Sequence, residues 1–129
     1  MSSRNKTILI VDDEPEIREA IGEMLRETAE YIVIEASSGP AALKISGQYE
    51  DRIDLLLTDL IMPGMTGRQL ADILRARCPG LEVIFMSGYV DESRGAAMEK
   101  DFPYIQKPLD FDRLENMIGE LWKAKKTKT

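Results

Sequence analysis

The chain has 129 residues, of which 43% are hydrophobic, and its 23 acidic and 17 basic side chains give a net charge of -6. This length suits one domain with its own core, so we expect a single domain over residues 1–129 with a core from about 7 to 122. The negative balance disfavours contact with nucleic acid or with an anionic membrane surface. Neither a secretion signal nor a membrane-spanning apolar stretch is recognisable, which favours a cytoplasmic location.

Histidine and cysteine usage limits the chemistry further. No histidine is present, which removes the commonest general base, the commonest metal ligand and any phosphohistidine of the chain's own. Cys78 is the single cysteine, so no internal disulfide can form. Because no histidine can activate it, Cys78 is predicted to serve packing or to lie at the surface, and not to act as a nucleophile.

The first part of the chain alternates strand and helix patterns. Residues 7–11 form a continuous apolar run, typical of a strand buried on both faces. Pro15 then starts an amphipathic helix. A second strand is predicted over 31–36, and Ser38 caps a short helix that ends near Gly47.

The central part continues the alternation. An apolar run over 53–58 predicts a third strand, which delivers Asp59 into a Pro/Gly turn. Beyond that turn, Thr66 and Gln69 have the spacing of a capping box, and the helix that follows is expected to stop at 79–80, the Pro-Gly pair.

The last part repeats the pattern with shorter elements. A fourth strand is predicted over 81–86, followed by a weakly patterned helix over 91–100, and a brief fifth strand over 104–106. Asp110 caps a final helix with an apolar stripe that reaches Trp122. The lysines after it are predicted to form a solvated tail: Lys123, Lys125, Lys126 and Lys128.

Strands that alternate with helices at this spacing predict an α/β fold with a parallel sheet. Ligands of such sheets bind beyond the carboxyl ends of the strands, where the strand order reverses. The second strand carries no chemistry at its end, so we expect it at an edge of the sheet. The other four strands all end in polar groups.

Three carboxylates are expected to gather at those strand ends: Asp12, Asp13 and Asp59. Like charges this close require a counter-ion, and oxygen ligands suit Mg²⁺. Lys107 and Ser87, which follow two other strands, add a cation and a hydroxyl. Such a set can hold a phosphoryl group, and aspartate is a known nucleophile for phosphoryl transfer, so Asp59 is the predicted phosphate acceptor.

Four segments carry a resemblance to a known family: 11–14 (VDDE), 58–67 (TDLIMPGMTG), 86–88 (MSG) and 107–108 (KP). In order and spacing they resemble the signature segments of bacterial response-regulator receiver domains, over residues 7 to about 122. The resemblance implies a flavodoxin-like (βα)5 fold, a doubly wound five-stranded parallel sheet with strand order 2-1-3-4-5 and helices on both faces.

The same resemblance implies roles for individual residues. Asp13, Asp59 and the main-chain carbonyl of Ile61 would hold Mg²⁺, with Asp12 supporting them. Lys107 would contact the phosphoryl oxygens. The remaining implied features are a switch hydroxyl, a switch aromatic and a cis peptide bond, at Ser87, at Tyr104 and between Lys107 and Pro108.

As a receiver, the chain would take its phosphoryl group from a partner histidine kinase or a histidine phosphotransfer domain in a two-component phosphorelay. It would signal to a downstream protein through strand four, helix four and strand five, and dimerisation on activation is compatible with the family. The sequence of residues 81–89 resembles that of receivers in hybrid sensor kinases. Ile61 and Tyr89 stand at the family's variable positions, and because neither readily places an attacking water, we expect slow self-dephosphorylation.

Two other hypotheses, an enzyme and a ligand-binding protein, compete with the receiver hypothesis. A Mg²⁺-dependent phosphohydrolase with Asp59 as nucleophile would usually carry a second acid two residues later, where this chain has Ile61. A flavin-binding protein on the same fold would need a phosphate loop after the first strand, where this chain has acids. Taken singly, Ser87 is a typical turn residue and Tyr104 a typical core residue, and their place in the set carries the functional reading.

Overall fold

The computed structural model describes residues 5–88 and 103–127, and its centre is a five-stranded parallel sheet in the order β2-β1-β3-β4-β5. The strands are β1 Lys6–Val11, β2 Tyr31–Ala36, β3 Leu55–Asp59, β4 Glu82–Ser87 and β5 Tyr104–Gln106. The helices are α1 Pro15–Arg26, α2 Gly39–Gln48, α3 Gly67–Arg77 and α5 Phe111–Thr127. The predicted fold class, strand order and edge position of the second strand are confirmed.

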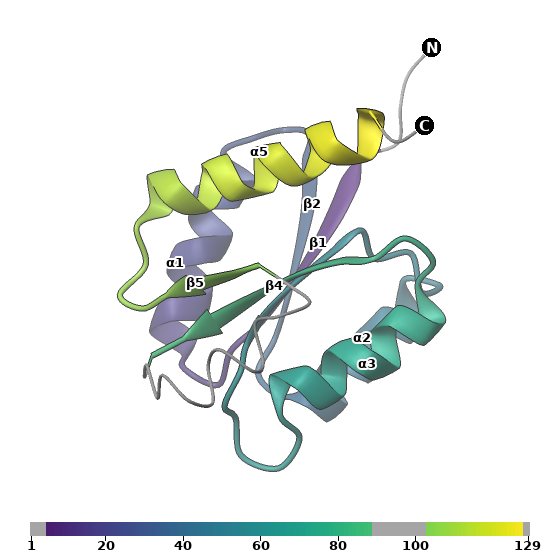
Figure 1. Cartoon of the computed structure of the whole chain (residues 1–129). Coiled ribbons are helices and arrows are strands. Elements are labelled where there is room, and N and C mark those ends of the chain that lie inside the picture. The colour runs from purple at the N-terminus through teal and green to yellow at the C-terminus, as the bar shows by residue number, and fades with distance from the viewer. Residues whose placement is uncertain (1–4, 89–102, 128–129) are drawn as a thin grey trace.

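The helices cover both faces of the sheet, with α1 and α5 on one face and α2 and α3 on the other (Figure 1). Side chains alternate between the faces along each strand. Leu9 and Leu56 therefore join the core on the α2–α3 side, whereas Ile8 and Leu55 join the core on the α1–α5 side. Because both faces are covered, every residue of β3 is buried, which explains its unbroken apolar run.

The helix starts follow the predicted caps. Pro15 is the first residue of α1, and the Ser38 side chain accepts a hydrogen bond from the Ala41 N–H. Thr66 and Gln69 form a complete capping box at the start of α3. These local signals set where each helix leaves its loop. The predicted cis bond between residues 107 and 108 is also present.

The C-terminal helix is longer than predicted. It runs to Thr127 and not only to Trp122, so residues 123–127 continue the helix and do not form a tail. Lys125 holds this last part against the sheet, because its Nζ donates to the Gly80 carbonyl and lies 3.9 Å from Glu82 Oε2. The segment 91–100, predicted as a helix, lies outside the described residues.

Three strands have slightly different bounds from the predicted ones. β1 begins one residue earlier, at Lys6, whereas β3 and β4 begin later, at Leu55 and Glu82, and each ends one residue further, at Asp59 and Ser87. Asp54, directly before β3, also bonds to β1, because its Oδ2 accepts the Thr7 N–H at 2.8 Å. In the described part of the chain, no helix is both long and apolar enough to cross a membrane.

Candidate phosphoacceptor site

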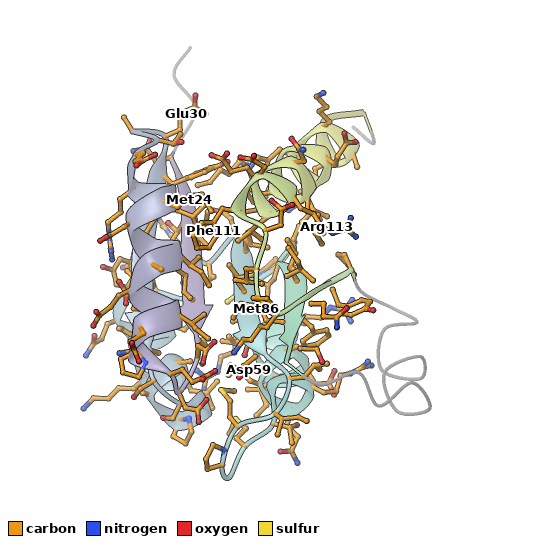
Figure 2. The ribbon with its side chains drawn as sticks, turned by 90° about the vertical axis from the view of Figure 1, so that its left-hand side faces the viewer. Met24, Glu30, Asp59, Met86, Phe111 and Arg113 are labelled. Carbon is orange, nitrogen blue, oxygen red and sulfur yellow. The ribbon has the colours of Figure 1, made fainter. Side chains whose placement is uncertain are left out.

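The sheet brings three charged side chains to its carboxyl edge. Val11 and Thr58 are partners in the β1–β3 ladder, so Asp12, directly after β1, and Asp59, the last residue of β3, lie at the same level. Lys107 comes directly after β5, and its main-chain N–H donates to the Ser87 carbonyl at 2.7 Å. Figure 2 shows Asp59 at this end of the molecule. The parallel topology therefore gathers residues that are far apart in the sequence.

The Lys107 ammonium is the centre of the arrangement. Its Nζ lies 2.8 Å from Asp12 Oδ2, 2.9 Å from Glu14 Oε1 and 3.2 Å from Asp59 Oδ2. The side chains of Asp12, Lys107 and Asp59 are 0%, 10% and 11% exposed. One cation thus faces three carboxylates, two of them buried, and the group keeps an excess of negative charge.

Burial and charge shift the ionisation of this group. Burial, together with the Asp12 charge, raises the pKa of Asp59, although the Lys107 charge opposes the shift. Burial alone would lower the pKa of Lys107, but hydrogen bonds to Asp12 and Glu14 and the charge of Asp59 outweigh burial and raise it. Lys107 therefore stays protonated at neutral pH.

Asp12 is fixed by hydrogen bonds on every side. Its N–H donates to the Ala36 carbonyl of β2 at 3.2 Å, and its Oδ1 accepts the Glu14 N–H at 2.9 Å. Its main-chain oxygen accepts Arg18 Nη1 at 2.8 Å. With Lys107 on Oδ2, every hydrogen-bonding group of Asp12 has a partner. A carboxylate with no solvent exposure needs this degree of satisfaction.

The turn after Asp59 is held just as firmly. The Leu60 N–H donates to the Met86 carbonyl of β4 at 2.9 Å, and the Ile61 N–H reaches Asp59 Oδ1 at 3.4 Å. Gly67 lies at the end of this turn, directly against the main-chain oxygen of Asp59. A Cβ at this position would overlap that oxygen. The missing side chain lets the start of α3 pack directly on the acceptor's backbone.

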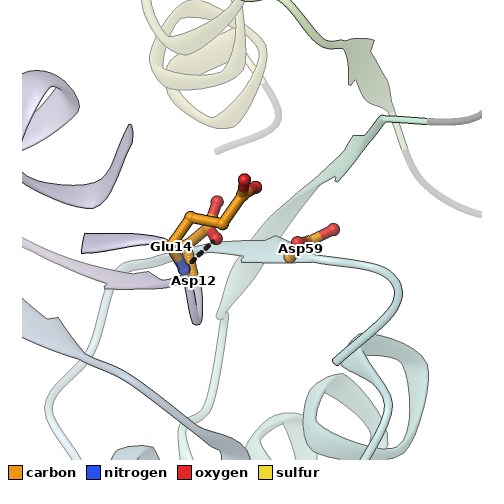
Figure 3. A group of neighbouring side chains, drawn as sticks. All are labelled: Asp12, Glu14 and Asp59. Atoms are coloured by element: carbon orange, nitrogen blue, oxygen red, sulfur yellow. Dashed lines mark hydrogen bonds between the residues drawn. The ribbon is translucent and has the colours of Figure 1, made fainter. Parts of the chain in front are cut away.

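The acids that could hold a metal differ in one member from the predicted set. In the described part of the chain, Asp12, Glu14 and Asp59 place one oxygen each within 4.8 Å of one another (Figure 3). Asp13, predicted to join them, is exposed and is not a member of this group. Asp13 lies in a bend after the end of β1, where its side chain is exposed while that of Asp12 is buried.

Glu14 is therefore the acid that the sequence-based prediction missed. The run of three acids after β1 was the available signal, but its spacing does not say which acids face the strand ends. Three carboxylate oxygens with solvent access on one side, where Glu14 is 58% exposed, are the donor set that suits Mg²⁺ with waters completing its shell. A ligand role for Asp13 stays a prediction.

Three further residues of the predicted site lie on β4, on β5 and in the turn after β3. Ser87 ends β4 at the same edge and is buried. Tyr104 begins β5, pairs with Phe85 across the ladder and is half-buried. The Ile61 side chain is 69% exposed, in the turn that follows Asp59.

A family model described as "Response regulator receiver domain" matches residues 8–119. The chain belongs to this family. Receiver domains are parts of two-component signalling proteins, response regulators and hybrid kinases, and this receiver has their five-stranded sheet together with an acidic group at its carboxyl edge.

Curated relatives are longer proteins that contain a similar segment. "Sensor kinase CckA" of Brucella abortus is 31% identical over 121 residues, which are 92% of this chain and 13% of that protein. "Transcriptional regulatory protein GlrR" of Escherichia coli is 32% identical over 123 residues, 93% of this chain and 27% of that protein. The receiver thus spans less than a third of each of these relatives.

Solved structures agree with the fold. The receiver domain of the hybrid histidine kinase CckA has a TM-score of 0.75 and 33% identity, covering 89% of this chain and 97% of that one. The response regulator TrrA of Thermotoga maritima, solved in complex with Mg(2+)-BeF, has a TM-score of 0.74 and 32% identity, covering 90% and 98%.

Proposed function

We propose that this receiver accepts a phosphoryl group on Asp59 from a phosphohistidine of a partner kinase or phosphotransfer protein, in an Mg²⁺-dependent step. The observation that carries the proposal is the convergence of Asp12, Glu14 and Asp59 around the Lys107 ammonium at the carboxyl edge of the sheet. The absence of histidine is compatible with this role, because the donor must then belong to another protein or domain.

In the proposed step, a carboxylate oxygen of Asp59 forms the new O–P bond while the P–N bond of the donor breaks, and the bonding pair stays on the imidazole nitrogen. Lys107 already contacts Asp59 Oδ2 and would bind an oxygen of the arriving phosphoryl group. The hydrogen bonds that hold the Asp59 turn keep the attacking oxygen in place. Bound Mg²⁺ would neutralise negative charge on the phosphoryl oxygens.

The proposed metal ligands are carboxylates of the acidic group and the main-chain carbonyl of Ile61. Asp12 and Asp59 supply two oxygens, and either Glu14 or Asp13 supplies or orients a third. The geometry supports Glu14, whereas the family resemblance supports Asp13. The Mg(2+)-BeF complex of TrrA, a protein 32% identical to this receiver, supports the choice of metal.

The output of phosphorylation is proposed to be a change of surface. Ser87 would move toward the new phosphoryl group and Tyr104 would turn inward, which alters the surface formed by β4, β5 and the segment that joins them. A downstream protein, or a second receiver on activation, would bind that surface. We propose a single cytoplasmic domain over residues 1–129 that signals and has no catalytic activity beyond its own phosphorylation and dephosphorylation.

Phosphorylation by a small donor tests the acceptor directly. The protein is incubated with acetyl phosphate or phosphoramidate, with and without MgCl₂, and the intact mass is measured. We expect one added phosphoryl group with Mg²⁺ only, and none in Asp59→Asn. Asp72→Asn, which removes an exposed carboxylate of α3 paired with Arg68, is the matched control and should behave as the unmodified protein. An Asp59→Asn protein that is still phosphorylated would refute the assignment.

The disputed ligand is tested by a second pair of variants. Calorimetric titration with MgCl₂ compares Glu14→Gln with Asp13→Asn, two neutral replacements of nearly unchanged shape. If Glu14 holds or orients the metal, only Glu14→Gln weakens binding, by roughly tenfold for the loss of a carboxylate contact. Weakening confined to Asp13→Asn would show that the Asp13 side chain turns into the site when the metal binds.

A further inference from the structure

A second ionic network lies on the α1–β2 side of Asp12, outside the phosphoacceptor group. Glu35 of β2 receives two arginines of α1: Arg18 Nε lies 3.3 Å from Glu35 Oε1, and Arg26 Nη1 lies 2.9 Å from Glu35 Oε2. The Glu35 and Arg18 side chains are 21% and 16% exposed. Glu35 is thus a charged residue in the otherwise largely apolar strand β2, and it accepts contacts from two arginines of the neighbouring helix.

Arg18 connects this network to the site. Its Nε faces Glu35, while its Nη1 donates to the main-chain oxygen of Asp12 at 2.8 Å. Arg26 makes a different second contact, from Nη2 to the Val33 carbonyl at 3.1 Å, well inside β2. The two arginines share one carboxylate, but only Arg18 touches a residue of the phosphoacceptor group.

The packing of α1 keeps room for these contacts. Gly22 lies on the buried side of α1, and a Cβ there would stand 2.8 Å from both Arg26 Nη1 and Glu35 Oε2. Gly22 is one of three buried residues of this amphipathic helix, and a side chain there would displace the guanidinium or the carboxylate from its present position. The absence of a side chain at Gly22 therefore leaves space for the ion pair between α1 and β2.

We propose that Arg18, held by Glu35, is a positioning residue for the Asp12 carboxylate in the metal site, an inference that rests on the proposed function. The Asp12 carbonyl belongs to the peptide that leads to Asp13, so fixing it fixes the path of the chain to Glu14. The Glu14 N–H in turn holds Asp12 Oδ1. Arg18 thereby sets the direction of both acids through the backbone, as outer partners do for metal-binding carboxylates.

A charge effect alone would act in the opposite direction. Removing a cation near the acids would make the site more negative and would tighten Mg²⁺ binding. Loss of positioning would weaken it. The sign of the change in Mg²⁺ affinity therefore separates positioning from electrostatics.

The test compares Arg18→Met with Arg26→Met by calorimetric titration with MgCl₂. Both variants lose one arginine of α1 and one ion pair with Glu35, so they match in charge and in partner. We expect Arg18→Met to weaken Mg²⁺ binding by about tenfold, the lower end of the cost of losing an outer partner, and Arg26→Met to change it by less than about twofold. Arg18→Lys, which keeps the charge and one donor, should recover part of the loss.

A metal-free measurement supports the same comparison. Amide hydrogen exchange at Asp12 and Glu14 should be faster in Arg18→Met than in the unmodified protein and unchanged in Arg26→Met. Tighter or unchanged Mg²⁺ binding in Arg18→Met, or equal weakening in both variants, would overturn the inference. If the unmodified protein binds no Mg²⁺ and gains no phosphoryl group, the proposed function fails, and equal exchange in all variants would then show that Arg18 does not hold the turn either.

Discussion

The two ends of the sheet differ in the interactions that their side chains make. Figure 2 shows Asp59 at one end and Glu30 at the other. At the carboxyl end, two buried carboxylates and a third, more exposed one surround a single ammonium. At the amino end, aromatic rings and the last turns of α5 cover the strands. The same strands therefore end in stabilising packing on one side and in crowded charge on the other.

The amino end is closed by Trp122 of α5. Its Nε1 donates to the Tyr31 hydroxyl at 3.2 Å, and the Lys6 ammonium lies 5.2 Å from the centre of its ring. Trp122 also packs against the core on the α1–α5 side. Apolar burial, a hydrogen bond and a cation–π contact all favour the folded state, so this end adds to stability without any evident chemical role.

The carboxyl end keeps charges that folding alone would not select. A buried carboxylate costs free energy unless it is fully paired, and three acids share one lysine. The raised pKa of Asp59 is the signature of that cost. The acceptor end therefore keeps an excess of negative charge, which a divalent cation can neutralise.

The largest expected change in stability is at the amino end. Trp122→Ala should lower the free energy of unfolding by about 3 kcal/mol, near the lower limit for a tryptophan because the ring is half-buried. Urea denaturation measures the loss, and Trp122→Phe, which keeps an aromatic ring without the N–H donor, should lose much less. Phosphorylation of both variants by acetyl phosphate at a temperature where they remain folded should be unchanged. Slower phosphorylation of either variant would show that the amino end of the sheet also affects the acceptor site.

Removing the lysine is the next largest change, and it acts at the carboxyl end. Lys107→Met leaves three acids without their cation and should cost about 2 kcal/mol at neutral pH, less than for a fully buried pair because Glu14 reaches solvent. The cost should shrink as the pH falls and the acids take up protons. Denaturation of both proteins with and without one fixed concentration of MgCl₂ should show a larger Mg²⁺ stabilisation in Lys107→Met than in the unmodified protein, because loss of the cation tightens Mg²⁺ binding. No acceptance of a phosphoryl group is expected.

Replacing the acceptor should stabilise the fold. The folded-state pKa of Asp59 lies above 3.8, so the folded protein binds more protons than the unfolded one between 3.8 and that raised pKa. The free energy of unfolding therefore falls as the pH rises through this window. Asp59→Asn lacks this titration and should gain roughly 1 kcal/mol at pH 7 and almost nothing below pH 3.8.

Denaturation series of both proteins across the pH range measure this difference. A gain that is equally large in acid would place its origin in packing and not in the charge of Asp59. A loss of stability at pH 7 would show that the ion pair with Lys107 outweighs the burial of the carboxylate.

Much of this arrangement was predictable from local chemistry. Apolar runs without alternation predicted buried parallel strands, and the capping residues Ser38 and Thr66 predicted where helices begin. The joint occurrence of Asp59 and Lys107 at strand ends predicted that they would meet. Each of these inferences depends on a short stretch of chain or on a topology that few rules determine.

The features that were missed depend on contacts between distant segments. The helix continues after Trp122, and there Lys125 donates to the Gly80 carbonyl, a partner that no local pattern predicts. The place of Glu14 in the acidic group beside Lys107 depends on the course of the chain after β1, which the run of three acids does not specify. Glu35 has no distinguishing feature in the strand pattern, and its ion pairs with Arg18 and Arg26 depend on how α1 packs on β2.

The smallest expected effect on stability comes from a substitution at Ile61, which should change the lifetime of the phosphorylated state and leave the fold almost unaffected. Ile61 is 69% exposed, so Ile61→Asn should change the free energy of unfolding by less than about 0.5 kcal/mol. An amide beside Asp59 can hold a water near the acyl phosphate, which the isoleucine side chain cannot, so the phosphorylated variant should lose its phosphoryl group several times faster. Decay of the intact-mass signal after removal of the donor measures the lifetime. Ile73→Asn, at an apolar residue of α3 that is 37% exposed, is the control. Equal lifetimes in all three proteins would mean that water reaches the phosphoryl group by a path that Ile61 does not govern.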